Sequence, residues 1–350
     1  MIETNRIEET LARLVGEVNR VPGRELAVQK LKGDASSRSY YRVARHGGPS
    51  NVVMVLPPDA AKSEEASKGD VPAELPFLNV HRWLAAHGVP VPRIEKVDLG
   101  AGVLVLEDLG DVTLEAALLA GGEKARDRWY GEAIDLLAAL RVAAEAGPGG
   151  SIAFERAFDF DLLRWEWDHY VEYGLRARTG HVPAPAEAKL LGEAGNRICR
   201  AIAELPRGFT HRDYQSRNLM VTGRGLVVID FQDALLGPRV YDLVALLRDS
   251  YVELPDAFVD AMLRRYLDGL KTRTGEAVPF EGFRRTFDLV TVQRKLKDGG
   301  RFEFIDRVKK NPSFLPHVPA SFRYVARALE RLPEERPLLD LLRGLHPEMR

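Results

Sequence analysis

The hydrophobic pattern of the chain changes character near Gly110. Before this point, short apolar runs alternate with turn-rich stretches, a pattern typical of β-strands. After it, Ala-, Leu- and Arg-rich segments recur with the period of an α-helix. Runs of strands followed by runs of helices favour an α+β fold, with the two kinds of element segregated. We therefore expect a small β-rich part followed by a larger, mostly helical part.

The individual elements follow from the same periodicity. Apolar residues at helical spacing between Ile7 and Val18 predict an opening helix. The strands are expected at residues 25–32, 39–43, 52–56, 93–97 and 103–107, with one helix at 77–87. The later helices are expected at 114–119, 125–145, 160–175, 186–204, 241–249, 255–270, 283–297 and 321–331. A hairpin at 219–221 and 226–229 interrupts them, and the segment from Pro57 to Pro72 predicts a mobile loop.

Composition limits the classes of function. A chain of 350 residues with 45% hydrophobic residues can bury a substantial core as one large domain or two lobes. A formal net charge of -1 argues against an electrostatically driven nucleic-acid binder. No run of about 18 uncharged apolar residues predicts a membrane span, and no signal peptide is visible at the N-terminus. We expect a cytoplasmic protein that binds neither nucleic acid nor membrane.

Residues suited to catalysis are concentrated in the segment after His211. Asp213 and Asn218 follow it in the order His-Arg-Asp-x4-Asn, the spacing of a kinase catalytic loop. The hairpin then returns the chain to Asp230, so Asn218 and Asp230 are expected at neighbouring strand ends. Asp242 opens the next helix and could hydrogen-bond back to the loop. His211 is interpreted as a structural residue that packs the loop.

This order of residues predicts phosphoryl transfer. An amide and a carboxylate supply the few, well-placed oxygen ligands that Mg²⁺ prefers when it also binds nucleotide phosphates. Asn218 and Asp230 are therefore the predicted metal ligands. Asp213 is the predicted catalytic base, accepting a proton from the attacking hydroxyl. A zinc site is disfavoured, because Cys199 is the only cysteine and the histidines show no ligand spacing.

The chain resembles the aminoglycoside phosphotransferase superfamily in two segments, HRDYQSRNLM and VVIDFQDALLGPRVYDLVALLRD. Within it, the closest similarity is to the bacterial cell-wall amino-sugar kinases, which phosphorylate the anomeric hydroxyl of N-acetylmuramate and N-acetylglucosamine. GDASSRSYYRV and LVLEDLGDVTL extend the resemblance over most of the chain. It implies a protein-kinase-like two-lobed fold, with a nucleotide-binding lobe at 1–108 and a helical lobe at 109–350. It also implies ATP and Mg²⁺ as cofactors, and a role in peptidoglycan recycling.

The resemblance further implies where the nucleotide binds. The turn that contains Ser36, Ser37 and Arg38 would cover the phosphates. Glu107 and Leu109 lie in the segment whose backbone would pair with the adenine edge.

One departure concerns the third predicted strand. A typical kinase carries a lysine there that reaches the α- and β-phosphates, but Val52–Leu56 contains none. Another cationic side chain must then neutralise the phosphate charge. The candidates are Arg38, Arg42 and Lys62.

Two helices contain the candidates for acceptor binding. Trp165 could stack on a sugar ring while Glu166 accepts hydrogen bonds from its hydroxyls, although core packing is the alternative for this tryptophan. Gln293 and Lys297 share a helix face at i,i+4 spacing, with Arg294 beside them. The resemblance implies that this element binds the acceptor, and such cations would suit the lactyl carboxylate of muramate. A solvated basic face is the alternative.

Two other functions are compatible with the sequence. A kinase for an amino-alcohol, such as an aminoglycoside, choline or homoserine, would need an acidic pocket. The helix from Trp165 to Glu172 partly offers one, whereas Arg294 and Lys297 partly contradict it. A non-catalytic binding protein on a kinase fold is a third possibility.

The catalytic segment itself disfavours a non-catalytic protein and also a protein kinase. A non-catalytic protein would usually have lost Asp213, Asn218 or Asp230, and all three are present. Protein kinase activity is disfavoured because only six residues separate Asp230 from Gly237, too few for an activation segment.

Overall fold

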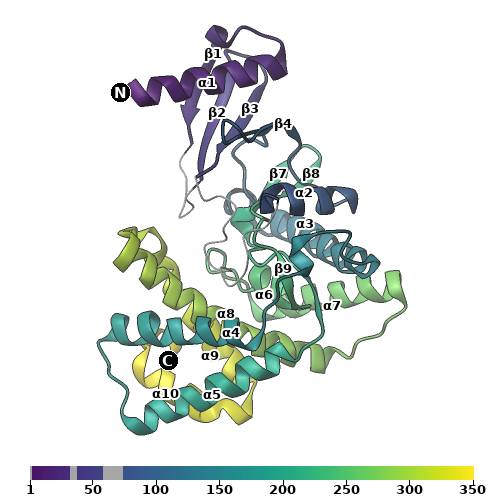
Figure 1. The fold of residues 1–350 in the computed structure, drawn as a ribbon. Helices are drawn as coiled ribbons and strands as arrows, with labels where there is room; N and C mark the ends of the chain where they lie inside the picture. Colours follow the sequence, from purple (N-terminus) through teal and green to yellow (C-terminus); the bar gives the residue numbers. More distant parts are fainter. Residues whose placement is uncertain (1, 32–37, 58–73) are drawn as a thin grey trace. The chain divides into compact units, whose positions relative to one another are not determined.

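The computed structural model describes residues 2–31, 38–57 and 74–350 (Figure 1). The chain divides into two compact units. The first comprises Met1–Val112 and Met220–Ile229, and the second comprises Thr113–Leu219 and Asp230–Arg350. The chain therefore passes between the units three times. Asn218 and Asp230 lie at or next to the last two of these crossings.

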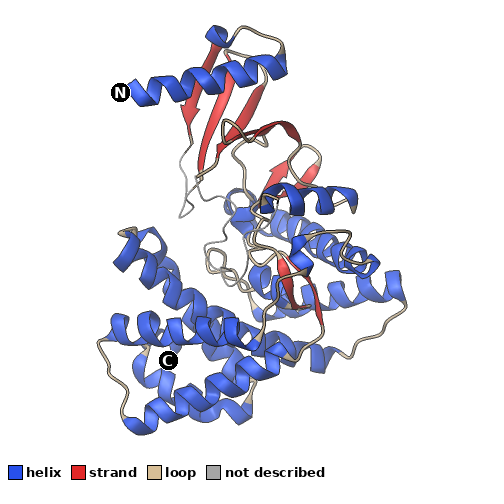
Figure 2. Ribbon diagram, in the orientation of Figure 1, coloured by secondary structure: helices blue, strands red, loops and turns tan. Residues whose placement is uncertain are grey.

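The first unit is built on a five-stranded antiparallel sheet in the order β1-β2-β3-β5-β4, drawn in red in Figure 2. All five predicted strands are confirmed. Their bounds are β1 Leu26–Lys30, β2 Ser39–Arg45, β3 Ser50–Val55, β4 Ile94–Asp98 and β5 Val103–Glu107. The helix α2, Pro76–Ala86, joins β3 to β4 along the chain, as predicted.

The opening helix α1, Ile2–Asn19, packs on this sheet (Figure 1). Leu11, Leu14 and Val15 recur at the i, i+3, i+4 spacing that places apolar side chains on one helix face. They are buried in one cluster with Val43 and Val53 of the sheet. Helix and sheet thus share a core, because each buries the apolar face that the other leaves open.

The predicted hairpin is also confirmed, and it belongs to the first unit. Its strands are β7, Leu219–Thr222, and β8, Gly225–Val228. The backbone N–H of Val228 donates to the carbonyl of Pro90 at 2.7 Å. Arg224 at the hairpin turn donates to the carboxylate of Glu107 at 2.7 Å. These bonds attach the hairpin to the end of β5.

The second unit is mostly helical, which confirms the α+β class. Its helices are α3 Leu114–Ala143, α4 Phe160–His169, a π-helix at Tyr170–Ala177, α5 Pro185–Ala203, α6 Tyr241–Leu247, α7 Asp256–Thr274, α8 Phe280–Lys309, α9 Val318–Glu330 and α10 Arg336–Leu345. Short 3-10 turns occur in the chain at 23–25, 144–146, 152–154, 216–218, 312–317, 333–335 and 347–349. Two short strands were not predicted, β6 Arg207–Thr210 and β9 Leu235–Pro238, which pair antiparallel.

Two predicted helix boundaries were wrong, and one predicted interruption was confirmed. Non-helical angles at Gly122 divide α3 between the predicted segments 114–119 and 125–145. The predicted helix 160–175 changes from α- to π-helix at Tyr170. The prediction that a helix ends at Lys297, before Gly299 and Gly300, was also wrong, because α8 continues to Lys309.

The glycine pair of α8 is explained by close packing. A Cβ on Gly299 would lie 2.6 Å from the ring of Phe322 in α9. A Cβ on Gly300 would lie 2.7 Å from the Cα of Tyr170 in the π-helix. The glycines therefore allow neighbouring elements to approach α8, at the cost of its intrinsic helix propensity.

Within the described ranges, no helix combines the length and the apolar character that crossing a membrane requires. The loop predicted from Pro57 to Pro72 falls, except for Pro57, outside the residues that the structure describes.

Candidate active site

The catalytic-loop segment follows β6, and α6 holds its first residues in place. The Asp242 carboxylate accepts hydrogen bonds from the backbone N–H of His211 at 2.7 Å and of Arg212 at 3.0 Å. This confirms the predicted bond from the start of α6. Arg212 has a φ of 80°, in the left-handed region that non-glycine residues rarely adopt. The two bonds from Asp242 stabilise this strained turn, which presents Asp213.

His211 is buried and its ring is part of the same turn. The backbone N–H of Asp213 donates to His211 Nδ1 at 3.3 Å. The ring also packs edge-on against Tyr214. These contacts agree with the interpretation of His211 as a structural residue.

A second aspartate that holds the catalytic loop was not predicted. The Asp249 carboxylate, just after α6, accepts hydrogen bonds from the backbone N–H of Ser216 at 2.8 Å and of Tyr251 at 3.1 Å. Burial is the main cause that raises the pKa of Asp249, and the hydrogen bonds to it act in the opposite direction. An aspartate near a helix end is usually a cap or turn residue. The sequence alone therefore does not indicate that Asp249 contacts the catalytic loop.

Asp213 is partly exposed and faces buried cations. Its side chain is 35% exposed, and Arg294 Nη2 donates to its Oδ1 at 3.3 Å. Arg294 Nη1 donates to the carbonyl of Arg212 at 2.8 Å, so one guanidinium holds both the backbone and the carboxylate of the loop. Burial alone would raise the pKa of Asp213, but Lys297 and Arg294 outweigh it and lower the pKa. Asp213 is therefore ionised at neutral pH.

Asn218 and Asp230 lie next to each other, as predicted. Asn218 Nδ2 donates to the carbonyl of Asp213 at 2.9 Å and lies 3.5 Å from Asp230 Oδ2. Gln232 Nε2 donates to Asp230 Oδ1 at 2.9 Å. Asp230 has a φ of 63°, a second strained position in the same site. Asn218 thus lies beside both Asp230 and the backbone of Asp213, which places the predicted metal ligands next to the residue predicted as base.

This donor set suits Mg²⁺ better than a transition metal. In the described part of the chain there is no group of three or more His, Cys, Asp or Glu side chains that could hold a metal ion. Asn218 and Asp230 offer hard oxygen donors from an amide and a carboxylate. Mg²⁺ is commonly bound by one or two such groups, with phosphate oxygens and water completing its shell. The residues present therefore fit a magnesium ion that arrives with a nucleotide.

The polar residues of α8 near this site are buried, so the alternative of a solvated basic face was wrong. Gln293, Arg294 and Lys297 are all buried. Gln293 Nε2 donates to Glu166 Oε2 at 2.8 Å, and Arg212 Nη2 lies 3.4 Å from Glu166 Oε1. Charged groups can be buried here because carboxylates and amides compensate them.

The residues predicted for the acceptor therefore fall into two sets. Glu166, Gln293 and Arg294 lie behind the loop and support Arg212 and Asp213. Trp165 is 48% exposed and stacks on His169, with ring centroids 5.5 Å apart, so core packing is not its role. The neighbouring Trp167 is buried in the core instead.

Of the predicted nucleotide-binding residues, Ser36 and Ser37 fall outside the described residues, and Arg38 directly precedes β2. Glu107 lies at the end of β5, where its carboxylate accepts from the backbone N–H of Arg93 at 3.0 Å. Leu109, two residues further on, is half-buried.

Arg42 is poorly suited to a phosphate. It donates to Asp108 at 2.7 Å and to Asp111 at 2.8 Å, which raise its pKa. These ion pairs are better explained as contacts that hold the segment after β5 to β2. Lys62 lies outside the described residues.

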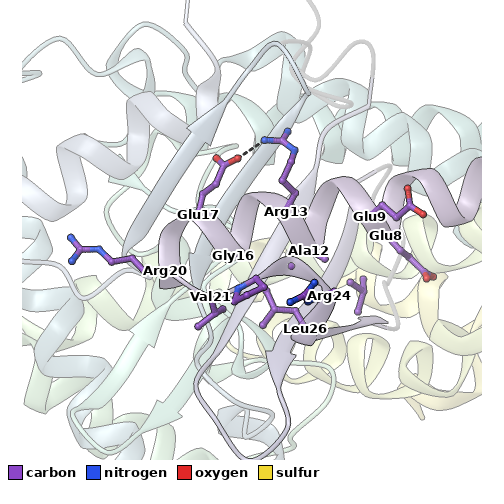
Figure 3. Close-up of a pocket in the computed structure, with 13 residues that line it drawn as sticks. Glu8, Glu9, Ala12, Arg13, Gly16, Glu17, Arg20, Val21, Arg24 and Leu26 are labelled. Carbon is purple, nitrogen blue, oxygen red and sulfur yellow. Dashed lines mark hydrogen bonds and ion pairs between the residues drawn. The ribbon is translucent and has the colours of Figure 1, made fainter.

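A separate pocket of about 690 Å³ lies in the first unit between α1 and β1 (Figure 3). Ala12, Gly16 and Leu26 line its apolar part, and the ion pair of Arg13 with Glu17 lies at its edge. None of the predicted site residues lines this pocket.

Comparisons with known proteins agree with this geometry. A model of the phosphotransferase enzyme family matches residues 27–277. N-acetylmuramate/N-acetylglucosamine kinase of Pseudomonas aeruginosa is 38% identical over 93% of this chain and 90% of that protein. The protein of the same name from Neisseria meningitidis serogroup B is 31% identical over 92% and 91%.

A solved structure of similar fold is an amicoumacin kinase in complex with AMP-PNP, Ca²⁺ and its ligand. It has a TM-score of 0.55 and 14% identity, and the match covers 86% of this chain and 88% of that one. At this identity the likeness concerns the fold alone, and it confirms the predicted protein-kinase-like fold.

Proposed function

The chain belongs to the phosphotransferase enzyme family, and from this premise we propose that it phosphorylates the anomeric hydroxyl of an amino sugar, N-acetylmuramate or N-acetylglucosamine. It is an ATP-dependent kinase that acts on a small molecule. The two curated relatives carry the names of these sugars and span nearly the whole chain. Cell-wall recycling in the cytoplasm, where ATP is available, is the setting that this reaction fits.

The observation that carries the proposal is the partly exposed carboxylate of Asp213, whose backbone carbonyl contacts Asn218, which in turn lies beside Asp230. Asp213 accepts a hydrogen bond from the acceptor hydroxyl and orients its oxygen. That oxygen forms a bond to the γ-phosphorus while the bond to the β,γ-bridging oxygen breaks, which releases ADP. The hydroxyl proton passes to Asp213.

Asn218 and Asp230 would hold Mg²⁺, which when bound neutralises negative charge on the nucleotide phosphates. The turn with Ser36, Ser37 and Arg38 is proposed to bind phosphates. The backbone near Glu107 and Leu109 is proposed to bind adenine. We also propose that residues 1–108 form the nucleotide-binding lobe and residues 109–350 the helical lobe that contains the catalytic loop.

The lowered pKa of Asp213 has a consequence for the acceptor. Lys297 and Arg294 keep the carboxylate ionised, and this also makes it a weak base. An anomeric hydroxyl is more acidic than an ordinary alcohol, so a weak base is sufficient to deprotonate it.

The test is a panel of acceptors with ATP and Mg²⁺: N-acetylmuramate, N-acetylglucosamine, choline, homoserine and an aminoglycoside. We expect turnover with the two amino sugars, and a product whose phosphate is attached at C1 by ³¹P and ¹H NMR. Loss of the reducing end gives an independent readout of the same position. Turnover of an amino-alcohol but of neither sugar would contradict the proposed acceptor.

A further inference from the structure

One face of α8 extends from the catalytic carboxylate towards solvent. Arg294 contacts Asp213, and Lys297, Arg301, Phe304 and Val308 follow at spacings of three and four residues, which place them on one helix face. Exposure rises along this face from 8% at Lys297, through a half-buried Arg301, to 53% at Val308. The face therefore leads outward from the site of phosphoryl transfer.

An aromatic ledge, formed by Trp165, His169, Tyr173 and Phe304, borders this face. Trp165 and His169 are stacked with their centroids 5.5 Å apart, and His169 lies 5.2 Å from Phe304. Tyr173 meets Phe304 edge-on at 5.1 Å. The ledge thus joins α4 and the π-helix to α8, in agreement with the crossing of α4 and α8 in Figure 1.

Arg301 lies at this ledge. Its guanidinium carbon is 5.2 Å from the centroid of the Phe304 ring, a cation–π distance that restrains the long side chain. It lies seven positions after Arg294, which corresponds to about 10 Å along the helix axis. This separation is comparable to the span of a substituted pyranose ring whose reacting hydroxyl lies at Asp213.

The two other cations on this face act on the catalytic carboxylate itself. Arg294 is fully buried, and its two terminal nitrogens donate to the Arg212 carbonyl and to Asp213. Lys297 lies 3.6 Å from Asp298 and lowers the pKa of Asp213. A substrate carboxylate bound by either would compete with the catalytic base for its counter-charge. Arg301 is the cation on this face that is set apart from Asp213.

We propose that Arg301 binds the carboxylate of an acidic amino-sugar acceptor, while the aromatic ledge stacks on its apolar surface. The inference rests on the proposed function and assigns the residue that distinguishes its two acceptors. N-acetylmuramate carries a lactyl ether with a carboxylate that N-acetylglucosamine lacks. A guanidinium matches a carboxylate in a planar, two-pronged contact, so one side chain can discriminate between the two sugars.

The test compares kcat and KM for both sugars in the wild type and in Arg301→Gln. We expect KM for N-acetylmuramate to rise by about 10- to 100-fold, the usual effect of losing a charge-assisted hydrogen bond. KM for N-acetylglucosamine should stay within about twofold, which also shows that the variant is folded. Arg301→Lys should restore part of the affinity for N-acetylmuramate, because it keeps the charge without the planar geometry.

Arg307→Gln is the matched control. Arg307 is on the same helix, but its direction differs from that of Arg301 by about 120° around the axis, and it pairs with Glu303 at 3.1 Å. This variant should leave both sugars unaffected. Trp165→Ala should raise KM for both sugars alike, because stacking does not depend on the lactyl group.

The outcomes are distinguishable. Equal losses for both sugars in Arg301→Gln, or no loss for N-acetylmuramate, would overturn the assignment of Arg301 and leave the kinase function intact. Turnover of neither sugar by the wild type would overturn the proposed function, and this inference with it.

Discussion

At the residue scale, the site depends on a few carboxylates with different surroundings. Asp213 is surrounded by cations that lower its pKa, whereas burial raises the pKa of Asp242. The first can work as an ionised base, and the second receives backbone N–H groups that hold the loop. Environment rather than residue type therefore separates catalytic from structural aspartates.

The influence of Lys297 on Asp213 can be tested by pH. Lys297→Met removes the largest of the cationic influences that lower the pKa of Asp213 against the effect of burial, so this pKa should rise. Because the base must be ionised, the acidic limb of the kcat/KM profile should move to higher pH. Lys271→Met, at an exposed position on α7, is the control and should leave the limb unchanged. An unmoved limb in Lys297→Met would show that this lysine does not tune the base.

The hydrogen bonds that Asp242 accepts from the catalytic loop can be tested by substitution. Asp242→Asn keeps the shape of the side chain but cannot accept both backbone hydrogen bonds as a carboxylate does. We expect a loss of about 1–3 kcal/mol in the free energy of unfolding and a fall in kcat, because Asp213 is no longer held. Asp268→Asn, exposed on α7, should change neither. Denaturant unfolding and steady-state kinetics on the same samples decide the point.

Several site residues could be predicted because their spacing is local. Asp213, Asn218 and Asp230 lie within 18 consecutive residues joined by one hairpin, so strand geometry alone brings them together. The pairing of Gln293 with Glu166 joins residues 127 positions apart, and no local pattern encodes it. The ion pair of Arg42 with Asp108, 66 positions away, was not predicted for the same reason.

At the element scale, α8 shows why propensity misled the boundary prediction. Gly299 and Gly300 indicate a break by intrinsic propensity, but tertiary contacts with Phe322 and Tyr170 require them inside the helix. The strands β1 to β5 were predictable because their short apolar runs are separated by turn-rich stretches or by a helix. The pair β6 and β9 was missed because each strand has only four residues and includes glycine.

Two glycine substitutions in α8 separate packing from propensity. Gly300→Ala places a Cβ 2.7 Å from the backbone of Tyr170, so we expect a loss of about 1–3 kcal/mol in the free energy of unfolding. Gly282→Ala, in the first turn of the same helix, meets no atom within 4 Å and should stabilise by up to about 1 kcal/mol. Thermal unfolding of both variants is the measurement. Stabilisation by both would contradict the close packing.

At the scale of the whole molecule, the chain combines two compact units, and its catalytic residues border the hairpin that links them in sequence. Asn218 and Asp230 precede and follow that hairpin. The nucleotide-binding segments were predicted mainly from family resemblance. Of the segment 33–38, only Arg38 lies within the described residues.

Ligand-linked stability tests the metal site in the intact protein. ATP with Mg²⁺ should raise the unfolding temperature, since saturation to about 100 times Kd contributes about 2.7 kcal/mol. In Asp230→Asn, the same nucleotide and metal concentrations should give a smaller rise, and activity should require more Mg²⁺. EDTA should abolish turnover in both proteins. An unchanged magnesium requirement in Asp230→Asn would remove this residue from the proposed metal site.

The central claim is that the Asp213 carboxylate accepts the proton of an amino-sugar hydroxyl during phosphoryl transfer from ATP. The most direct measurement is kcat with N-acetylmuramate and N-acetylglucosamine for the wild type and Asp213→Asn, with unfolding temperature as a control for folding. We expect kcat to fall by about 10²- to 10⁴-fold with both sugars, while KM for ATP changes little. Turnover by a folded Asp213→Asn variant within about threefold of the wild type would contradict the account.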